Sequence, residues 1–262
     1  HWCAMLRDKE GGAKVALTNS EVPSDLYSEV LDNLFSRIKI HTKTDGDDTN
    51  VKIMFAKTWI DKSTYVVSDK GVDTIMYDYV INRKLTKTPT MTSTYSAGKK
   101  AFFAYVSNFC VDKGVEFSSD PKENRKYIGF MVSEIIKAID DTVSAKSGMS
   151  FVQDCVDGKD KEIHYRTQLG FHMYMNPKVE YKREFKVRVD GRVRRVTFNY
   201  KGDRINCRAL KTGIAPNFIH SNDATHMLKT VLACDHITHW MMVHDQFGCH
   251  HAFVDDMQIG IR

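Results

Sequence analysis

Two short runs of alternating side chains, joined by Asp190-Gly191, limit the fold of this chain more than any other feature. Residues 185–189 and 192–198 mix apolar and basic side chains with a period close to two. That period is typical of a β-strand, and Asp-Gly between two such runs is the strongest short-range signal for a hairpin. The sequence therefore predicts a two-stranded basic ribbon at about 184–200. One face or the tip of this ribbon carries up to four arginines, namely Arg188, Arg192, Arg194 and Arg195.

Helical periodicity characterises two segments that precede the ribbon. Residues 24–38 repeat apolar side chains at helical intervals, which predicts an amphipathic helix entered through Pro23 and Ser24. Asp120-Pro121 has the form of a helix start, with a capping aspartate followed by proline in the first turn. The apolar stripe that continues to residue 143 has helical spacing, and we expect it to be buried in a core.

Two further elements are expected after the ribbon. Ser221-Asn222-Asp223 are residue types that cap helices, so we expect a helix to begin there and to follow the segment 213–218. Trp240–Val243 is a short apolar run that ends at His244-Asp245. It predicts a strand that delivers an aspartate into a turn.

Composition narrows the class of protein. The 262 residues are 42% hydrophobic and 27% charged, which excludes wholesale disorder. The formal net charge of +5 suits a polyanionic partner. We find no apolar run of membrane-spanning length and expect no membrane partner. Six cysteines without CxxC pairs favour a reducing compartment over a disulfide framework. The first residue is His1 and the ends are abrupt, so we expect a fragment of a longer protein.

Arg83, Lys87, Met91 and Tyr95 fall four residues apart. On a helix, steps of four keep side chains on one broad face, here with two cations at its N-terminal end and a phenol at the other. A helix N-terminus also favours phosphate. The face therefore suits a nucleoside triphosphate. From the spacing alone, a solvated basic face that precedes a core tyrosine is the more common arrangement.

Two other groups of residues have more than one interpretation. Asp245 is placed to offer a carboxylate to a metal ion, but turn aspartates often cap their own backbone. His220 is a candidate donor to a base or a phosphate, and a structural histidine is the alternative. A zinc site is a weaker hypothesis because its ligands lack regular spacing. Its ligands would come from His239, His244, Cys249, His250 and His251.

Taken in order, these groups resemble the single-subunit, phage-type DNA-dependent RNA polymerases, which include the mitochondrial enzymes. The resemblance rests on residues 1–12, on INRKLTKTPTMTSTY at 81–95, on GIAPNFIHSNDATHMLKT at 213–230 and on HDQFG at 244–248. It implies an α+β, mostly helical chain that forms part of a right-hand polymerase fold. Residues 1–10 would end one palm segment, 11–219 would form the fingers with the ribbon, and 220–262 would form a second palm segment.

The resemblance also implies roles for individual residues. Arg83 and Lys87 would bind the incoming triphosphate, with Lys87 placed to protonate the leaving pyrophosphate. Tyr95 would lie beside the sugar and help to select ribose, with Met91 on the same nucleotide-binding face. Tyr27 would lie near the phosphates.

The remaining roles concern metal and nucleic acid. Asp245 would be one of two aspartates that bind two Mg²⁺ ions, and His220 would contact the minor groove of the nascent base pair. The ribbon would read promoter bases, because a two-stranded ribbon fits the major groove and arginine pairs with guanine. The implied partners are double-stranded promoter and template DNA, nascent RNA and NTPs. We expect a monomer in the cytoplasm of a phage-infected bacterium, with the mitochondrion as the alternative.

The sequence departs from the family pattern at several points. Pro89 lies inside the motif helix, which then either begins at Thr88 or bends at the proline. The family's usual glycine after the tyrosine is Ser96, and Gln246 follows the metal aspartate where phage enzymes typically have serine. The family's other metal-binding aspartate is not in these residues. We therefore expect the 262 residues alone to be catalytically incomplete.

Two alternatives to RNA synthesis remain at this point. A family A DNA polymerase shares the fold, but it usually has an aromatic residue where this helix has Thr90 and Met91, and Glu where Gln246 stands. A non-catalytic nucleic-acid-binding module would use the basic ribbon alone.

Overall fold

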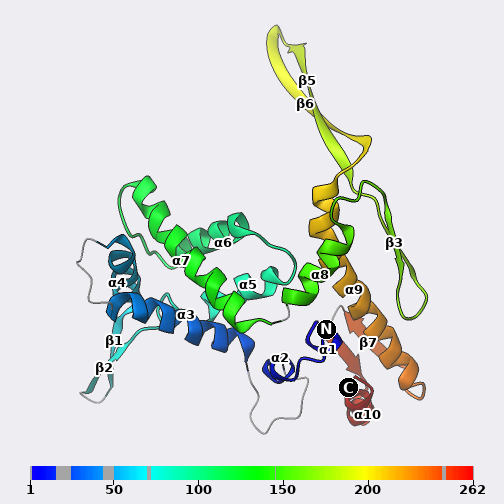
Figure 1. Cartoon of the computed structure of the whole chain (residues 1–262), viewed down its shortest axis with the longest axis horizontal. Helices are drawn as coiled ribbons and strands as arrows, with labels where there is room; N and C mark the ends of the chain where they lie inside the picture. Colours follow the sequence, from blue (N-terminus) through cyan, green and yellow to red (C-terminus); the bar gives the residue numbers. More distant parts are fainter. Residues whose placement is uncertain are drawn as a thin grey trace. The chain divides into compact units, whose positions relative to one another are not determined.

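The computed structural model describes residues 2–15, 25–43, 50–69, 72–144, 146–243 and 246–261 (Figure 1). It divides into two compact units, Trp2–Met149 and Ser150–Arg262, and each is described by itself. Both helices and strands are present, with helix predominating. This agrees with the expected α+β, mostly helical class. The right-hand arrangement and the boundaries near residues 10 and 219 stay predictions.

The unit Trp2–Met149 is built mainly of helices. They are α1 (Trp2–Met5), α2 (Lys9–Lys14), α3 (Leu26–Lys43), α4 (Val51–Ser63), α5 (Arg83–Ser93), α6 (Lys99–Asp112) and α7 (Pro121–Thr142). One antiparallel hairpin joins them, with strands β1 (Tyr65–Asp69) and β2 (Val72–Met76). Helix α3 packs against α4, α5 and α7, and α6 packs against α5 and α7.

The core of this unit confirms the predicted helices. Val30, Leu34 and Ile38 of α3 are fully buried, as the apolar spacing of 24–38 predicts. The side chain of Asp25 accepts hydrogen bonds at the start of α3, from Tyr27 N and from Ser28 Oγ. At the start of α7, Asp120 accepts a bond from Lys122 N at 2.9 Å, as expected of a capping aspartate.

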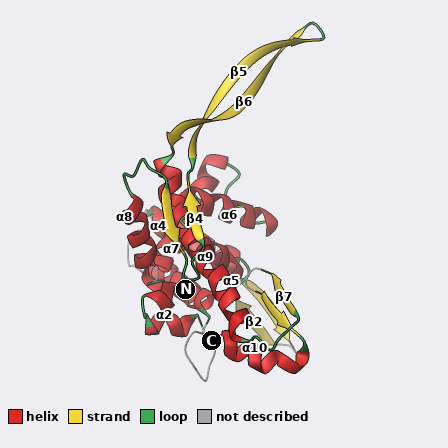
Figure 2. Cartoon of the chain, turned by 90° about the vertical axis from the view of Figure 1, so that its right-hand side faces the viewer, coloured by secondary structure: helices red, strands yellow, loops and turns green. Residues whose placement is uncertain are grey.

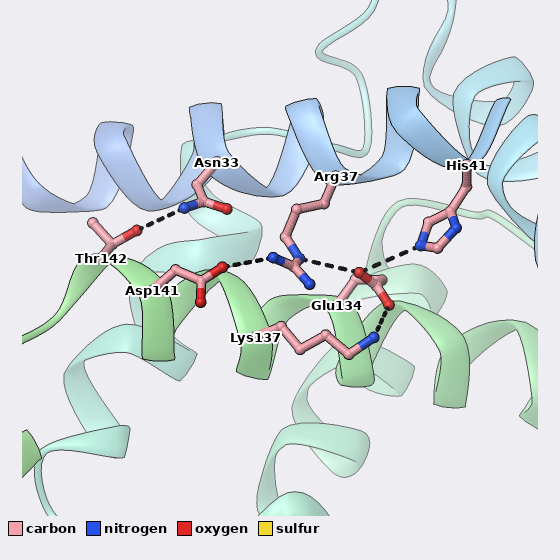
Figure 3. Close-up of polar contacts among 7 residues, drawn as sticks. All are labelled: Asn33, Arg37, His41, Glu134, Lys137, Asp141 and Thr142. Carbon is pink, nitrogen blue, oxygen red and sulfur yellow. Dashed lines mark hydrogen bonds and ion pairs between the residues drawn. The ribbon is translucent and has the colours of Figure 1, made fainter. Parts of the chain in front are cut away.

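A seam of polar side chains joins α3 and α7 (Figure 3). Glu134 of α7 is only 2% exposed and is surrounded by Arg37, His41 and Lys137. Arg37 also donates to Asp141 at 2.6 Å. The seam also holds a hydrogen bond from Asn33 Nδ2 to Thr142 Oγ1 at 3.3 Å. Because Glu134 is buried, its contacts with cations decide whether its charge is tolerated.

The unit Ser150–Arg262 centres on a long helix, α9 (Cys207–Ala233), and three antiparallel hairpins (Figure 2). The hairpins pair β3 (Ile163–Arg166) with β4 (His172–Met175), β5 (Lys178–Val189) with β6 (Arg192–Ile205), and β7 (Trp240–Val243) with β8 (Gln246–Cys249). A 3-10 turn (His251–Phe253) and α10 (Val254–Ile261) complete it, and α10 packs against α9. Helix α8 (Lys146–Val156) spans the boundary between the units.

The expected helix start at Ser221–Asp223 is wrong. Helix α9 begins at Cys207, capped by Asn206, and runs through that segment without interruption. Ser221 Oγ and Asn222 Nδ2 both donate to the carbonyl of Phe218, 2.7 and 2.9 Å away. Polar side chains of these types can bond back to their own helix instead of capping a new one.

No helix in the described parts of the chain is both long and apolar enough to cross a membrane.

Candidate functional site

Helix α5 carries the four-residue spacing noted in the sequence. Asn82 begins it, and its Oδ1 accepts bonds from Lys84 N at 3.0 Å and Leu85 N at 3.2 Å. Arg83 is therefore the first helical residue, and a start at Thr88 is wrong. Pro89 lies buried inside the helix. A proline at such a position removes one backbone hydrogen bond of the helix.

The exposed face of α5 presents three of the four spaced residues. Arg83, Lys87 and Met91 are exposed. The opposite face is buried through Leu85, Thr86, Pro89, Thr90 and Ser93. Tyr95 lies beyond the last helical residue, Ser93, so the continuous helical face predicted to reach it is wrong. Its side chain is 40% exposed, which does not support the alternative that it is a core tyrosine.

The turn after Tyr95 has unusual backbone geometry at Ser96. Its φ is 67°, in the left-handed region that residues with a side chain rarely adopt. The geometry gives a physical reason for a glycine at this position, because glycine occupies this region without steric cost. Ser96 therefore carries local strain directly after the predicted sugar-binding tyrosine.

A cluster of charges and one aromatic ring lies at the N-terminal end of α5. Arg83 donates through Nε and Nη2 to both carboxylate oxygens of Asp25. Its guanidinium also lies 5.1 Å from the ring centre of Tyr27, and Lys87 Nζ lies 6.0 Å from the same ring. Thr86 Oγ1 donates to the carbonyl of Tyr27 at 3.2 Å. The structure thus brings Tyr27, predicted to lie near the phosphates, beside Arg83 and Lys87, predicted to bind the triphosphate.

The electrostatics of this cluster are dominated by the Asp25–Arg83 pair. The hydrogen bonds from Arg83 lower the pKa of Asp25 to about 2, with smaller contributions from Ser28 Oγ and Tyr27 N. Asp25 is therefore ionised throughout the neutral range. The cluster keeps a positive balance, because Lys87 adds a second cation beside the neutralised Arg83.

Sequence reasoning did not find Asp25. Its only local signal is that of a capping residue at the start of α3. Its ion-pair partner, Arg83, is 58 positions away in the sequence. Thr86 was missed for the same reason, because its bond to Tyr27 depends on how α3 and α5 pack.

The predicted ribbon is confirmed as β5 and β6. Asp190 and Gly191 have φ values of 50° and 74°, as a two-residue hairpin turn requires. The ribbon runs from the N-terminal end of α9, and its residues from Glu180 to Lys201 are exposed (Figures 1 and 2).

The register separates the four predicted arginines onto two faces. Residues paired across an antiparallel ladder share a face. Arg188 and Arg195 pair with Val193 and Lys186 and lie on a face that also carries Lys182, Glu184 and Lys201. Arg192 and Arg194 pair with Val189 and Val187 on the other face. The four arginines therefore gather around the tip, and the alternative that one face carries them all is wrong.

The face with Arg192 and Arg194 is largely aromatic and aliphatic. Tyr181 stacks on Tyr200, with ring centres 5.6 Å apart, and Phe185 meets Phe198 edge-on at the same distance. The guanidinium of Arg183 lies 5.3 Å from the centre of the Phe185 ring. The ribbon is thus amphipathic. The face with Arg188 and Arg195 is basic and polar, and the face with Arg192 and Arg194 is mostly apolar.

The other predicted residues are placed only in part. His220 lies on an exposed position of α9, within the helix and not before it. Strands β7 and β8 confirm the predicted apolar strand and pair Val243 with Gln246. His244 and Asp245, which connect the two strands in sequence, lie outside the described residues. Among the residues that are described, no group of three or more His, Cys, Asp or Glu side chains is placed to hold a metal ion.

Comparison with known proteins covers the whole chain. A family model described as DNA-dependent RNA polymerase matches residues 1–262. The DNA-directed RNA polymerase of Pseudomonas phage phiKMV is 30% identical over 272 residues, which cover 100% of this chain and 30% of that protein. T7 RNA polymerase of Escherichia phage T7 is 26% identical, over 95% of this chain and 31% of that enzyme.

An organellar relative matches as well. DNA-directed RNA polymerase 1, mitochondrial, of Arabidopsis thaliana is 25% identical over 100% of this chain and 25% of that protein. The chain spans less than a third of the length of each of these relatives.

Proposed function

This chain belongs to the DNA-dependent RNA polymerase family, and we propose that it supplies the fingers and part of the palm of a phage-type enzyme that synthesises RNA on a DNA template. One observation carries the proposal: Arg83 and Lys87 extend from one exposed end of α5 beside the ring of Tyr27. Two cations beside a helix N-terminus suit the phosphates of an NTP. The relatives are named RNA polymerases, so the DNA polymerase alternative is not favoured.

The residues of α5 and Tyr95, just past it, are proposed to contact different parts of the nucleotide. Arg83 and Lys87 bind the triphosphate, and Lys87 protonates the leaving pyrophosphate. Tyr95, just past the helix, lies beside the ribose, with Met91 between the phosphate and sugar positions. The exposure of all four side chains supports this assignment, because a substrate must reach them.

Magnesium is part of the proposal. Mg²⁺ prefers carboxylate oxygens together with phosphate and water. One segment of the protein therefore needs to supply only one carboxylate ligand. Asp245 would be that carboxylate in this chain. The ions would supply charge stabilisation for nucleotidyl transfer. A second carboxylate from elsewhere in the polymerase would complete the set.

The ribbon is proposed to bind promoter DNA, and His220 to contact the nascent base pair. The amphipathic register of the ribbon supports a division of roles between its two faces. We assign Arg188 and Arg195 to DNA, because their face also carries Lys182 and Lys201 and is polar except at Val193. The whole protein would act as a monomer in the cytoplasm of an infected bacterium, with double-stranded DNA, nascent RNA and NTPs as partners.

Extension of a primed template tests the overall function. The full-length polymerase that contains these residues should incorporate NTPs, and Lys87→Ala should reduce the rate at saturating NTP by about 100-fold, in the range for loss of a general acid. Met54→Ala, an exposed change on another helix, is the control. The 262 residues alone should show no templated addition. Extension by this chain alone would contradict the expected need for a second carboxylate.

Sugar selection tests the role of Tyr95. In the full-length enzyme, Tyr95→Phe should retain much of the activity but accept deoxynucleotides more readily, because the hydroxyl that senses the 2′-position is lost. A hydrogen bond to a substrate hydroxyl supports strong discrimination. An unchanged ratio of ribonucleotide to deoxynucleotide incorporation would show that Tyr95 does not select the sugar.

Paired variants on a promoter library test the ribbon. Removing Arg188 and Arg195 should relax base preference, by about 1–3 kcal/mol for each arginine that contacts a base edge. Removing Arg192 and Arg194 takes away the same charge from the apolar face and serves as the matched control. If both pairs weaken binding equally on every sequence and lower the salt dependence alike, the ribbon binds phosphates only.

A further inference from the structure

The carboxylate of Asp25 is held by four donors, which fix it more firmly than an exposed side chain usually is. Oδ1 accepts from Tyr27 N at 3.2 Å and from Arg83 Nη2 at 3.1 Å. Oδ2 accepts from Ser28 Oγ at 2.7 Å and from Arg83 Nε. Each oxygen therefore has one donor from the first turn of α3 and one from Arg83. The helix start orients the carboxylate, and the carboxylate orients the guanidinium.

Arg83 uses only one edge of its guanidinium in this pair. The group has five N–H donors in a planar fork, and the bonds to Asp25 occupy Nε and one N–H of Nη2. The second N–H of Nη2 and one N–H of Nη1 form another edge that points away from Asp25, and the remaining N–H of Nη1 lies on the third side of the group. No described residue accepts a hydrogen bond from these three N–H groups. The Arg83 side chain is 48% exposed, so solvent and solutes can reach it.

We propose that Asp25 is a positioning residue, which holds the guanidinium of Arg83 by one edge so that the other edge is preset to bind the phosphates of a nucleoside triphosphate. The inference rests on the proposed function of the α5 face. Arginine loses much side-chain freedom when it binds an anion, and fixing it beforehand removes that cost from binding. The ring of Tyr27, 5.1 Å from the guanidinium, restricts the same side chain from a second side.

A carboxylate that merely occupied the phosphate site would be arranged differently. A competing group must leave when phosphate binds, whereas Asp25 is tied to the backbone of α3 and takes the edge nearest the Arg83 main chain. The bond from Thr86 Oγ1 to the carbonyl of Tyr27 at 3.2 Å further joins the two helix starts. The pair and the phosphate can therefore contact Arg83 together.

Titration calorimetry of the 262-residue chain with inorganic tripolyphosphate, without metal, tests the inference. Asp25→Asn is the central variant, because asparagine caps a helix as well as aspartate but cannot pair with Arg83 as an anion. Asp32→Asn, an exposed position on the same helix, removes the same charge without contacting Arg83 and is the matched control. Arg83→Gln and the double variant with Asp25→Asn complete a cycle.

We expect Asp25→Asn to weaken binding about 2- to 12-fold, which corresponds to the cost of ordering one flexible side chain. Asp32→Asn should leave binding unchanged or slightly tighter, because a negative charge is lost. In the Arg83→Gln background, Asp25→Asn should have no further effect. A purely structural role for Asp25 would instead weaken binding in both backgrounds.

The outcomes separate this inference from the proposed function. If the unaltered chain does not bind tripolyphosphate, or Arg83→Gln has no effect, the phosphate-binding role of α5 is wrong and this inference falls with it. Arg83→Gln could weaken tripolyphosphate binding while Asp25→Asn leaves the affinity unchanged, or makes it higher than that of Asp32→Asn. That result would overturn only the positioning role.

A spectroscopic readout checks the geometry itself. In ¹⁵N-resolved NMR spectra, the Arg83 Nε–H should give a protected resonance in the unaltered chain, and it should persist when tripolyphosphate binds. The resonance should exchange rapidly with water in Asp25→Asn and remain protected in Asp32→Asn. Loss of protection in the unaltered chain on adding tripolyphosphate would show that phosphate displaces Asp25, and would overturn the inference.

Discussion

Replacing Glu134 with glutamine should destabilise the unit Trp2–Met149 more than any other single loss of charge in its polar seam. Glutamine keeps the volume of the side chain but removes the negative charge from a site that is 2% exposed. Lys137 Nζ lies 2.7 Å from one carboxylate oxygen, and Arg37 Nε lies 3.2 Å from the other. His41 Nε2 is 3.6 Å from the second oxygen.

The magnitude follows from the burial of each partner. Removing one member of a fully buried ion pair costs about 3–5 kcal/mol, because the other charge is left without compensation. Here the side chains that contact Glu134 are 26–47% exposed and regain water when the carboxylate is lost. We therefore expect a smaller loss of about 2–3 kcal/mol, close to one charged hydrogen bond. This would lower the melting temperature of the unit by about 4–12 °C.

Asp141→Asn is the matched control in thermal and urea unfolding followed by circular dichroism. It also removes one negative charge that contacts Arg37, but Asp141 is 52% exposed, so its loss should cost less than about 1 kcal/mol. Equal destabilisation by the two variants would refute the argument that burial sets the cost.

The pH dependence gives a second check. Burial acts to raise the pKa of Glu134, but Lys137, His41 and Arg37 together outweigh it, and the pKa lies below its ordinary 4.5. A lowered pKa means that the folded state holds its proton less tightly than the unfolded chain. The stabilisation is therefore complete above about pH 5 and is lost as the pH falls through the folded-state pKa. The difference between the unaltered chain and Glu134→Gln should shrink toward pH 3, and a constant difference would contradict this assignment.

Three further predictions concern other parts of the chain. Ser96→Gly should raise the free energy of unfolding by up to about 1 kcal/mol, because it relieves a left-handed φ of 67°; a loss of stability in urea unfolding would argue against strain there. Asp120→Ala should lower it by about 0.5–2 kcal/mol through loss of the α7 cap, whereas Asp120→Asn should be nearly neutral; equal losses would show that charge, and not capping, matters. At pH 8, a thiol reagent should label the exposed Cys155 and Cys207 quickly, but Cys110 only after unfolding, because burial raises its pKa to about 12; rapid labelling of a third thiol that maps to Cys110 would contradict its burial.

Local signals in the sequence were enough for elements whose stability is mostly local. The start of α7 needs only Asp120 and a following proline, and the ribbon turn needs only residues that accept positive φ. The alternating residues of the ribbon also fix its strands, because the stretch from Glu180 to Lys201 is exposed and its strands pair with each other. In these cases the same few neighbours both carry the signal and make the contacts.

Tertiary contacts decided where helices α9 and α5 begin and end, which the sequence left open or predicted wrongly. Ser221 and Asn222 have the chemistry of a helix cap, yet packing of α9 keeps them inside a helix and turns their side chains to its carbonyls. Burial of one face of α5 likewise keeps Pro89 within that helix.

The pairings of charges show the same limit most clearly. Asp25 meets Arg83 across 58 positions, and Glu134 meets Arg37 across 97. Each of these residues reads locally as a cap or as part of a solvated helix face. The sequence by itself determined which charged groups the chain carries and on which helices. Only the packing of α3 against α5 and α7 decided which groups meet, because a contact between distant positions leaves no periodicity or spacing in either segment.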